Sequence, residues 1–554
     1  MIRLVLLTFV LCLTISCSIS KKEKVDLIVY NAVIYTADQN FSIGESMAIK
    51  DGVIVEVGTS REVRQKYSSS SEYDAKGKAI FPGFIDAHAH FYGYGSNLQS
   101  ADLRNKKSFD EVLKELEEFA KTHKEGFLLG RGWDQNLWDE KEFPSNEKLN
   151  QLFKDRPVYL VRVDGHAALV NYRALELAGI NDQTRVQGGE ILKKDGKLQG
   201  VLIDNAMSLV RDKIGAPSVL EIEKSLKDAQ QYSFAAGLTT VVDAGLDYQF
   251  VDIIEKMQAE KELKIRLSVM LSDSKENLDY LVNRGKIKTP KLSVQGFKFY
   301  GDGALGSRGA CLLDDYFDMK GHRGFLLKDK SYFSDMAKVL YDHGFQMNTH
   351  AIGDSTNREI LEVYAQVLKG KNDLRWRIEH AQIVSPEDLG KFNQYSIIPS
   401  VQPTHATSDM IWAKDRLGPK KIETAYAYKN LLRQNGYLPL GTDFPVEDLS
   451  PIKTFYAAVA RKNLDGYPEG GFQPENSLSR KEAILGMTIW AAKGSFLEKE
   501  VGSLEKGKIA DFIVLDRDLM SVPLDHILDT KILRTYVDGN VVYNYEELRS
   551  GIKL

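Results

Sequence analysis

Short apolar runs that end in polar residues alternate with longer helix-like segments along most of the chain, and this alternation limits the fold more than any other feature. The rhythm is typical of a parallel β/α architecture. Eight such runs occur, at 79–90, 239–245, 265–271, 294–304, 346–354, 375–382, 397–405 and 437–446. Eight parallel strands, each followed by a helix, predict an α/β chain with a (β/α)8 TIM-like barrel, in which the chemistry lies at the carboxyl ends of the strands.

Two histidines, His88 and His90, close the first apolar run. Side chains alternate along a strand, so Asp86, His88 and His90 are predicted to point to the same side. Two neutral imidazoles from one stiff element supply half of a transition-metal site, and we expect Asp86 to orient one of them from behind. A His-x-His pair alone is also compatible with two surface histidines, so the ends of the other strands decide between the two interpretations.

Further side chains that can bind a metal close the later runs. His350 closes the fifth run, His380 the sixth and Asp443 the eighth. With His88 and His90, four of the ten histidines are therefore predicted to face one mouth of the barrel, which a random scatter would rarely give. These strand ends predict a metal site at the barrel mouth.

Lys298 lies inside the fourth apolar run, where a charged side chain needs an explanation. One interpretation is that its amine reaches solvent or pairs with Asp302. The other is that burial makes the amine neutral, so that it adds carbon dioxide and forms a carbamate, an anionic ligand with two oxygens that suits two cations. We favour the carbamate, with Asp302 as a supporting residue behind the ligands.

Composition sets the size and class of the molecule. A chain of 554 residues with 43% hydrophobic content can bury a large core, and predicts one large domain with a smaller companion. The formal net charge is only -4 and there is no long basic run, so the electrostatic footprint of a nucleic-acid binder is missing. The expected partner is a small molecule.

The first residues predict export. Residues 1–17 have the pattern of a signal peptide, with an apolar run too short for a comfortable membrane span. Their end resembles a bacterial lipoprotein signal in which Cys17 carries the lipid, and this predicts a protein anchored to a membrane of the cell envelope. Thr14 stands where such signals usually have leucine, so a secreted or periplasmic soluble protein is the alternative. Cys311 then remains as a lone cysteine, expected to be packed, and the mature chain has no disulfide pair.

Several phrases carry a family resemblance when they are taken together and in order. They lie at 130–134, 164–168, 296–303, 350–354, 378–382, 402–405 and 441–446. In these phrases the chain resembles the amidohydrolase superfamily, and within it the amidohydrolase 3 family, which includes N-substituted formamide deformylases. The similarity extends over nearly the whole mature chain.

The resemblance implies a second, smaller domain, a β-sandwich made from both chain ends. Here these ends are 25–81 and 495–554, and the barrel occupies 82–494. The segment 103–235 is long for a connection between two strands, so it predicts an inserted subdomain over the barrel mouth that shapes the substrate pocket.

Four further residues match family positions expected to contact substrate. Trp133, Asp134 and His166 lie in the predicted insertion, although Trp133 could equally pack in a core and His166 could be structural. His405 closes the seventh run, and we expect it to contact the substrate more than a metal.

The resemblance also implies a ligand set, which comprises His88, His90, the carboxylated Lys298, His350, His380 and Asp443. This set suits two divalent ions, zinc first, with iron, manganese or nickel as alternatives. If Lys298 is an unmodified amine, a one-metal site is favoured instead.

The implied reaction is hydrolysis of a carbon–nitrogen bond other than a peptide bond, in an amide or an N-substituted formamide. A metal-bound hydroxide attacks, and Asp443 passes the proton to the leaving nitrogen. The alternatives are a cyclic amide, lactone or ester hydrolase on the same site, or a catalytically inactive lipoprotein that binds a small ligand.

Overall fold

Seven parallel strands form the centre of the computed structural model, which describes residues 22–549. In order around the sheet they are β10 (Phe84–Ala89), β17 (Leu238–Leu246), β18 (Arg266–Ser272), β20 (Leu292–Tyr300), β21 (Gln346–Ala351), β22 (Arg377–His380) and β23 (Ile398–Ser400). Every neighbouring pair in this order is parallel. The predicted signal peptide and Cys17 lie outside the described residues.

The eighth predicted strand is present only as a short closing segment. Leu440 forms a single parallel bridge with Val401, next to β23. On the other side, the backbone N–H of Asp443 donates to the carbonyl oxygen of His88 at 2.8 Å. The barrel prediction is confirmed, but a regular strand over 437–446 is wrong, because Asp443 has a φ of 62° and this left-handed conformation interrupts an extended chain.

The first predicted run is divided between two sheets. Its first half is β9 (Ala79–Pro82), which belongs to a sheet outside the barrel, and its second half is the barrel strand β10. Gly83 separates them, and a Cβ at this position would lie 2.3 Å from the hydroxyl oxygen of Thr239. A glycine is therefore required where the chain passes from one sheet to the other.

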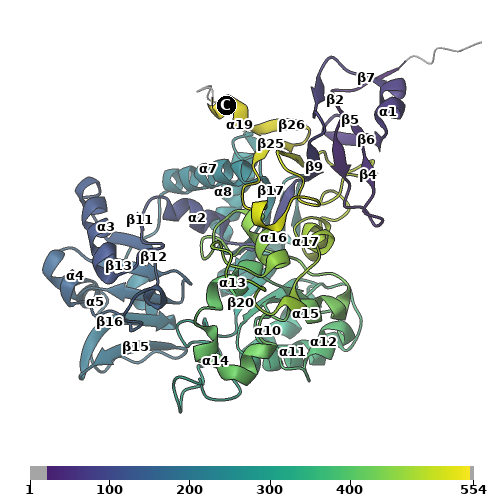
Figure 1. Cartoon of the computed structure of the whole chain (residues 1–554). Helices are drawn as coiled ribbons and strands as arrows, with labels where there is room; N and C mark the ends of the chain where they lie inside the picture. The colour runs from purple at the N-terminus through teal and green to yellow at the C-terminus, as the bar shows by residue number, and fades with distance from the viewer. Residues whose placement is uncertain (1–21, 550–554) are drawn as a thin grey trace, which may run out of the picture.

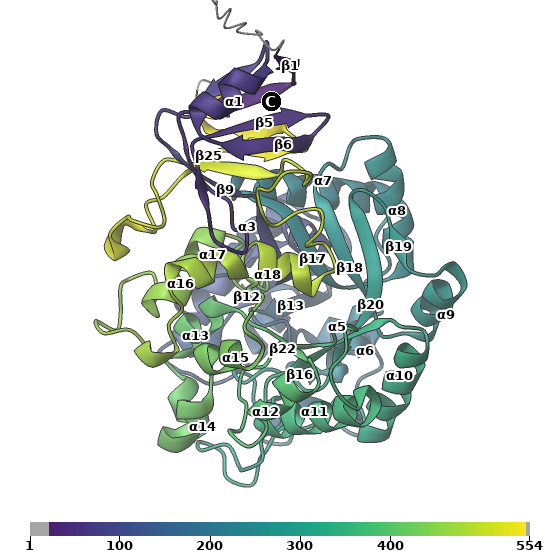
Figure 2. The same cartoon turned by 90° about the vertical axis from the view of Figure 1, so that its right-hand side faces the viewer.

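Helices surround the barrel, and one or more of them follow each strand (Figures 1 and 2). They are α7 (Val219–Ala235), α8 (Tyr248–Ala259), α9 (Lys275–Arg284), α10 (Lys330–Asp342), α11 (Asp354–Leu368), α12 (Leu389–Gln394), α13 (Pro403–Asp409), α14 (Ala413–Lys421), α15 (Tyr428–Asn435), α16 (Pro451–Ala460), α17 (Arg480–Gly486) and α18 (Ile489–Gly494). Their apolar residues recur at helical spacing: in α10 the buried side chains are Phe333, Ala337 and Leu340.

Two smaller sheets from both chain ends pack together beside the barrel (Figure 2). One contains β2 (Leu27–Tyr30), β5 (Ser46–Lys50), β6 (Val53–Gly58) and β8 (Glu72–Asp74), and the other contains β3 (Val33–Tyr35), β4 (Ile43–Gly44), β9, β24 (Phe512–Leu515), β25 (Ile532–Val537) and β26 (Asn540–Asn544). A short pair, β1 (Glu23–Lys24) with β7 (Tyr67–Ser68), and the helices α1 (Ser60–Lys66) and α19 (Tyr545–Arg549) complete this region. Its apolar core joins residues from both ends of the chain, among them Val29 and Phe512.

A six-stranded sheet between β10 and α7 forms a separate lobe, at the left in Figure 1. Its strands are β11 (Ala101–Asp102), β12 (Leu128–Trp133), β13 (Val158–Arg162), β14 (Ala167–Val170), β16 (Lys197–Asp204) and β15 (Gly189–Lys194), and its main helices are α3 (Phe109–Thr122), α4 (Glu147–Leu152), α5 (Tyr172–Leu177) and α6 (Ser208–Arg211). The short helix α2 (Phe91–Asn97) leads into it from β10. Two apolar clusters of its own stabilise this lobe, which we call the insertion.

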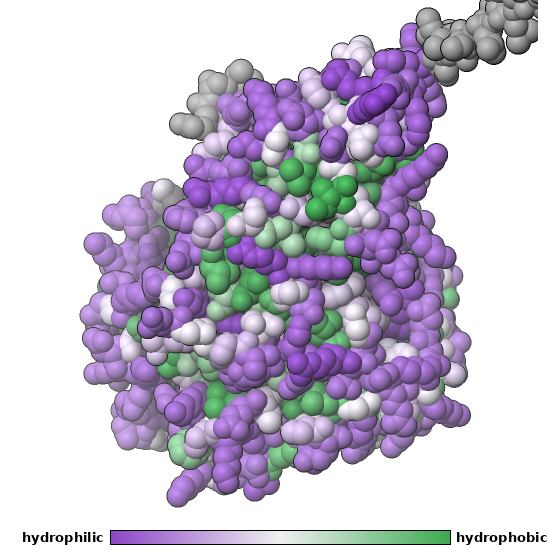
Figure 3. All heavy atoms as spheres, turned by 45° about the vertical axis from the view of Figure 1, so that its right-hand side comes forward, coloured by the Kyte–Doolittle hydropathy of each residue, from purple (hydrophilic) through white to green (hydrophobic). Residues whose placement is uncertain are grey.

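The face seen in Figure 3 is mainly hydrophilic at its edges, with hydrophobic side chains gathered in patches towards its centre. Among residues 22–549, none of the helices combines the length and the hydrophobicity that a membrane-spanning segment requires.

Candidate metal centre

His88, at the end of β10, is oriented by an acid from a distant strand. Its Nδ1 lies 2.6 Å from Oε2 of Glu379 on β22, and both side chains are fully buried. Arg377 holds Glu379 in turn, with Nε 2.6 Å from Oε1. Burial and the charge of Lys298 lower the pKa of His88 to about 4, so the ring is neutral, which is the form that binds a metal. Only Nε2 of His88 is then left to face the centre of the barrel.

Asp86 lies behind His88 and contacts backbone and hydroxyl groups. Its carboxylate accepts the backbone N–H of His88 at 3.1 Å and the hydroxyl of Thr442 at 2.7 Å. Asp86 thus links β10 by hydrogen bonds to the turn that carries Asp443, while Glu379 orients the imidazole of His88. Among the described residues, backbone and hydroxyl groups donate to the Asp86 carboxylate, and the orienting role predicted for it stays a prediction.

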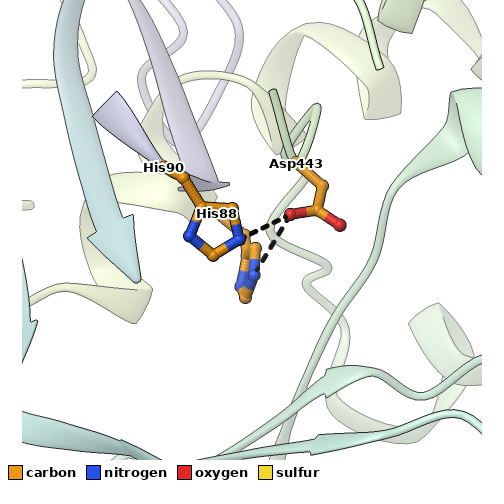
Figure 4. Close-up of side chains that lie close together, drawn as sticks. All are labelled: His88, His90 and Asp443. Carbon is orange, nitrogen blue, oxygen red and sulfur yellow. Dashed lines mark ion pairs between the residues drawn. The ribbon is translucent and has the colours of Figure 1, made fainter. Parts of the chain in front are cut away.

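Asp443 faces His88 of β10 and His90, the residue directly after that strand. Its Oδ1 lies 3.1 Å from Nε2 of His90 and 3.6 Å from Nε2 of His88 (Figure 4). The ligand atoms of these three residues lie within 4.8 Å of one another, a spacing that suits one metal ion. Burial alone would raise the pKa of Asp443, but the nearby imidazoles of His90, His88 and His380 hold it well below its usual range. Asp443 is therefore a carboxylate, ready to act as a ligand.

His380 and His350 close β22 and β21 beside this group. The ring of His380 lies 4.5 Å from that of His350 and 5.0 Å from that of His88. Nδ1 of His380 lies 2.8 Å from Oε1 of Gln402, which leaves Nε2 for a metal. His380 also has a φ of 72°, and such strain in a residue other than glycine is typical of functional sites.

Asp302 supports His350 from the loop after β20. Its carboxylate accepts the backbone N–H groups of Ile352 and Gly353 at 3.0 and 2.9 Å, and the hydroxyl of Thr356 at 2.8 Å. One oxygen also lies 3.5 Å from Nε2 of His350. Asp302 therefore holds the turn that follows His350, while its supporting role at a metal site stays a prediction.

His405, at the start of α13, belongs to a second group of ligand type. The ligand atoms of His380, His405 and Asp443 lie within 4.8 Å of one another. Nε2 of His405 is 3.6 Å from Oδ2 of Asp443, and it is buried without a hydrogen-bond partner. A buried polar atom without a partner is costly in a protein, and a bound cation would satisfy it. His405 was predicted mainly as a substrate contact, and the geometry makes it a candidate ligand as well.

Lys298 is fully buried on β20 and faces His88. Its Nζ lies 3.1 Å from Nε2 of His88 and 4.9 Å from the centre of the Tyr300 ring. Within the described part of the chain, no carboxylate lies within 4.0 Å of this amine. Burial lowers the pKa of Lys298 to about 8, even though Glu379 and Asp443 oppose the change. The amine therefore neither reaches solvent nor pairs with Asp302, and its neutral form, which can add carbon dioxide, is within reach near neutral pH.

The three predicted residues of the insertion take different places. Trp133 is buried in the core of the insertion, where its indole N–H donates to the carbonyl of Leu160 at 2.8 Å, so the packing alternative is favoured. Asp134 forms an ion pair with Arg162 of the same lobe. The ring of His166, by contrast, lies 5.1 Å from that of His350 and so reaches the histidine cluster.

Sequence reasoning missed four residues around this centre, which are Arg131, Asp204, Glu379 and Gln402. The signal for Glu379 was the same as for Lys298, a charge inside an apolar strand. Arg131 lies on β12, and its Nε is buried without a hydrogen-bond partner. Burial lowers the pKa of Arg131, and the charge of Asp443 opposes this effect.

Residues 71–543 match the amidohydrolase family. The protein LONG AFTER FAR-RED 3 of Arabidopsis thaliana is 32% identical over 94% of this chain and 91% of its own length. An N-substituted formamide deformylase of Arthrobacter pascens is 27% identical over 95% of this chain and 99% of its own. The crystal structure of an uncharacterized metal-dependent hydrolase from Pyrococcus horikoshii OT3 superposes with a TM-score of 0.74 at 26% identity, covering 90% of this chain and 99% of that one.

Proposed function

The chain belongs to the amidohydrolase family, and from this premise we propose that it hydrolyses a carbon–nitrogen bond other than a peptide bond, in an amide or an N-substituted formamide. The observation that carries the proposal is Asp443, a buried carboxylate that faces imidazoles with each of its two oxygens at the mouth of the barrel. The deformylase from Arthrobacter pascens, which aligns over 99% of its length, supports this class of substrate.

We propose that two zinc ions bind at this centre. His88, His90 and Asp443 would hold the first ion, and His350, His380 and the carbamate of Lys298 would hold the second. Neutral imidazoles and carboxylates are the ligands that zinc prefers in catalytic sites. When bound, such ions supply a Lewis acid that activates water and polarises the substrate carbonyl.

The residues of the chain itself would direct the proton and the substrate. Asp443 would accept the proton of the attacking water at a carboxylate oxygen and deliver it to the leaving nitrogen, because an amide nitrogen leaves poorly without a proton. Glu379 and Arg377 hold His88 in one orientation, so the ligand cage is set before the substrate binds. His166 and His405, from the insertion and from α13, would contact the substrate.

The first experiment uses the chain without residues 1–17, prepared without added metal or chelator. Plasma mass spectrometry should find close to two transition-metal ions per chain. A screen of N-formyl amines, N-acyl amines, lactones and esters should then give turnover with the first two classes, and His88→Ala, which removes a metal ligand, should lose both metal and turnover. Metal content near zero after refilling with zinc and bicarbonate would refute the proposal, and turnover confined to lactones or esters would reassign the substrate.

We further propose that the mature chain is exported and held at a membrane of the cell envelope by lipid on Cys17. The order of residues 13–17 supports this. In a bacterial host, the full chain should label with a palmitate probe and sediment with membranes, whereas Cys17→Ser should not label. If the Cys17→Ser chain still incorporated the palmitate probe, the proposal that Cys17 carries the lipid would be refuted.

A further inference from the structure

An aspartate and a histidine of the insertion form a tight pair at the edge of the metal centre. Nδ1 of His166 lies 2.6 Å from Oδ1 of Asp204, and the backbone N–H of Asp204 donates to the carbonyl of His166 at 3.0 Å. The Asp204 side chain is fully buried, while that of His166 keeps 15% of its surface exposed. The pair therefore has one buried end, and Nε2 of His166 is the ring nitrogen left for another partner.

The open end of this pair lies next to the residues of the barrel site. The ring of His166 is 5.1 Å from that of His350 and 6.5 Å from that of Tyr300. The insertion has another histidine, His123, whose ring stacks on Phe119 at 3.8 Å on the exposed side of α3. Of these two, His166 alone reaches the centre, so its position is not a general property of histidines in this lobe.

Asp204 is held in an unfavourable conformation. Its φ and ψ are 49° and -121°, values that residues other than glycine rarely adopt. Its second oxygen, Oδ2, is buried without a hydrogen-bond partner. Strain and an unsatisfied buried oxygen both destabilise the fold, and they persist only where the surrounding structure imposes them.

Backbone from the barrel encloses the Asp204 carboxylate. Gly303 and Gly309, in the loop after β20, approach it so closely that a Cβ at either would lie 2.4 or 2.5 Å from Oδ2. The Oδ2 side of the carboxylate therefore packs against backbone of the barrel, while Oδ1 faces the His166 ring.

We infer that Asp204 is a positioning residue that holds Nδ1 of His166 as a hydrogen-bearing nitrogen, so that Nε2 faces the amide group of the substrate at the metal centre. This inference rests on the proposed function, because it needs a substrate beside His350. A carboxylate behind a histidine fixes both the ring orientation and the tautomer, which a hydrogen bond to substrate requires. The insertion then contributes a residue that contacts the substrate, in addition to covering the barrel mouth.

The test compares Asp204→Asn and His166→Gln with the matched control Asp110→Asn, an acid of the same lobe in an exposed ion pair with Lys148. On an N-formyl amine that the wild type hydrolyses, Asp204→Asn and His166→Gln should each lower kcat by about 10- to 100-fold. Metal content should stay at the wild-type value. The double variant should be no slower than His166→Gln, because both substitutions remove the same interaction with the substrate.

A second measurement is independent of turnover. In a protein labelled with 15N-histidine, the His166 signals, assigned by their loss in His166→Gln, should show a hydrogen on Nδ1, and Asp204→Asn should change them. Unchanged His166 signals in Asp204→Asn, or a double variant whose losses multiply, would overturn the inference. If the wild type hydrolyses no amide, the proposed function fails, and the 15N signals still decide whether Asp204 positions His166.

Discussion

Replacing Glu379 by glutamine tests the buried support of the metal centre. The side chains of Glu379, His88 and Arg377 are all fully buried, so solvent does not screen their interactions. Burial alone would raise the pKa of Glu379, but Arg377 and His88 lower it from 4.5 to about 2. Since one pKa unit corresponds to ~1.4 kcal/mol, the ionised Glu379 stabilises the fold by about 3 kcal/mol. The cost of breaking a buried ion pair, about 3–5 kcal/mol, agrees with this value.

Glu379→Gln should therefore lower the free energy of unfolding by about 3 kcal/mol at pH 7, measured by urea denaturation of the metal-free protein. Because the folded-state pKa lies below the unfolded one, the stabilisation is fully present above pH 4.5 and is lost as the pH falls towards about 2. The difference between the wild type and the variant should therefore shrink in that window. Zinc affinity should also fall by about 10- to 100-fold, because His88 loses the acid that orients it.

The matched control is Glu362→Gln, a glutamate on the outer helix α11 in an exposed ion pair with Lys330. This change should alter the free energy of unfolding by less than ~1 kcal/mol and leave zinc affinity unchanged. The reasoning is refuted if Glu379→Gln unfolds at the wild-type urea concentration and binds zinc as tightly as the wild type.

Three further substitutions test the residues that face the centre. Asp443→Asn should reduce kcat by about 100-fold or more with an unchanged circular dichroism spectrum, and activity near the wild-type value would contradict the assignment of proton transfer. His405→Ala should lower metal content if His405 is a ligand, whereas a higher KM at full metal content would make it a substrate contact only. Lys298→Ala should abolish the carbamate signal that 13C-bicarbonate gives in the wild type by NMR, and the absence of that signal from the wild type itself would favour a one-metal site.

Local patterns were sufficient to predict the barrel and most of its ligand-type residues. Apolar runs and helical spacing recur every few residues, so they are visible without knowledge of distant contacts. His350 and His380 do lie at the ends of β21 and β22, as the alternation of apolar runs and helix-like segments predicted. The eighth strand was mispredicted because its apolar residues match a strand, while hydrogen bonds to β10 and the turn at Asp443 decide its conformation.

The insertion shows the same limit at the level of single residues. Trp133 and His166 both lie in family phrases, yet one packs in a core and the other reaches the centre. Each assignment depends on which face of a sheet turns towards the barrel. Periodicity within one strand gives two faces but not the neighbour that covers each of them.

The sequence by itself determined the class of fold, the family and the set of side chains that end the strands, because these follow from local spacing and short phrases. Only the tertiary structure decided which partner fixes each of these side chains. Glu379 meets His88 across 291 residues of chain, and Asp204 is enclosed by glycines of a loop in another lobe. The orientation and the protonation state of a buried side chain depend on the atoms within about 3 Å of its polar atoms. Those atoms come from distant parts of the sequence, so only the folded chain brings them together.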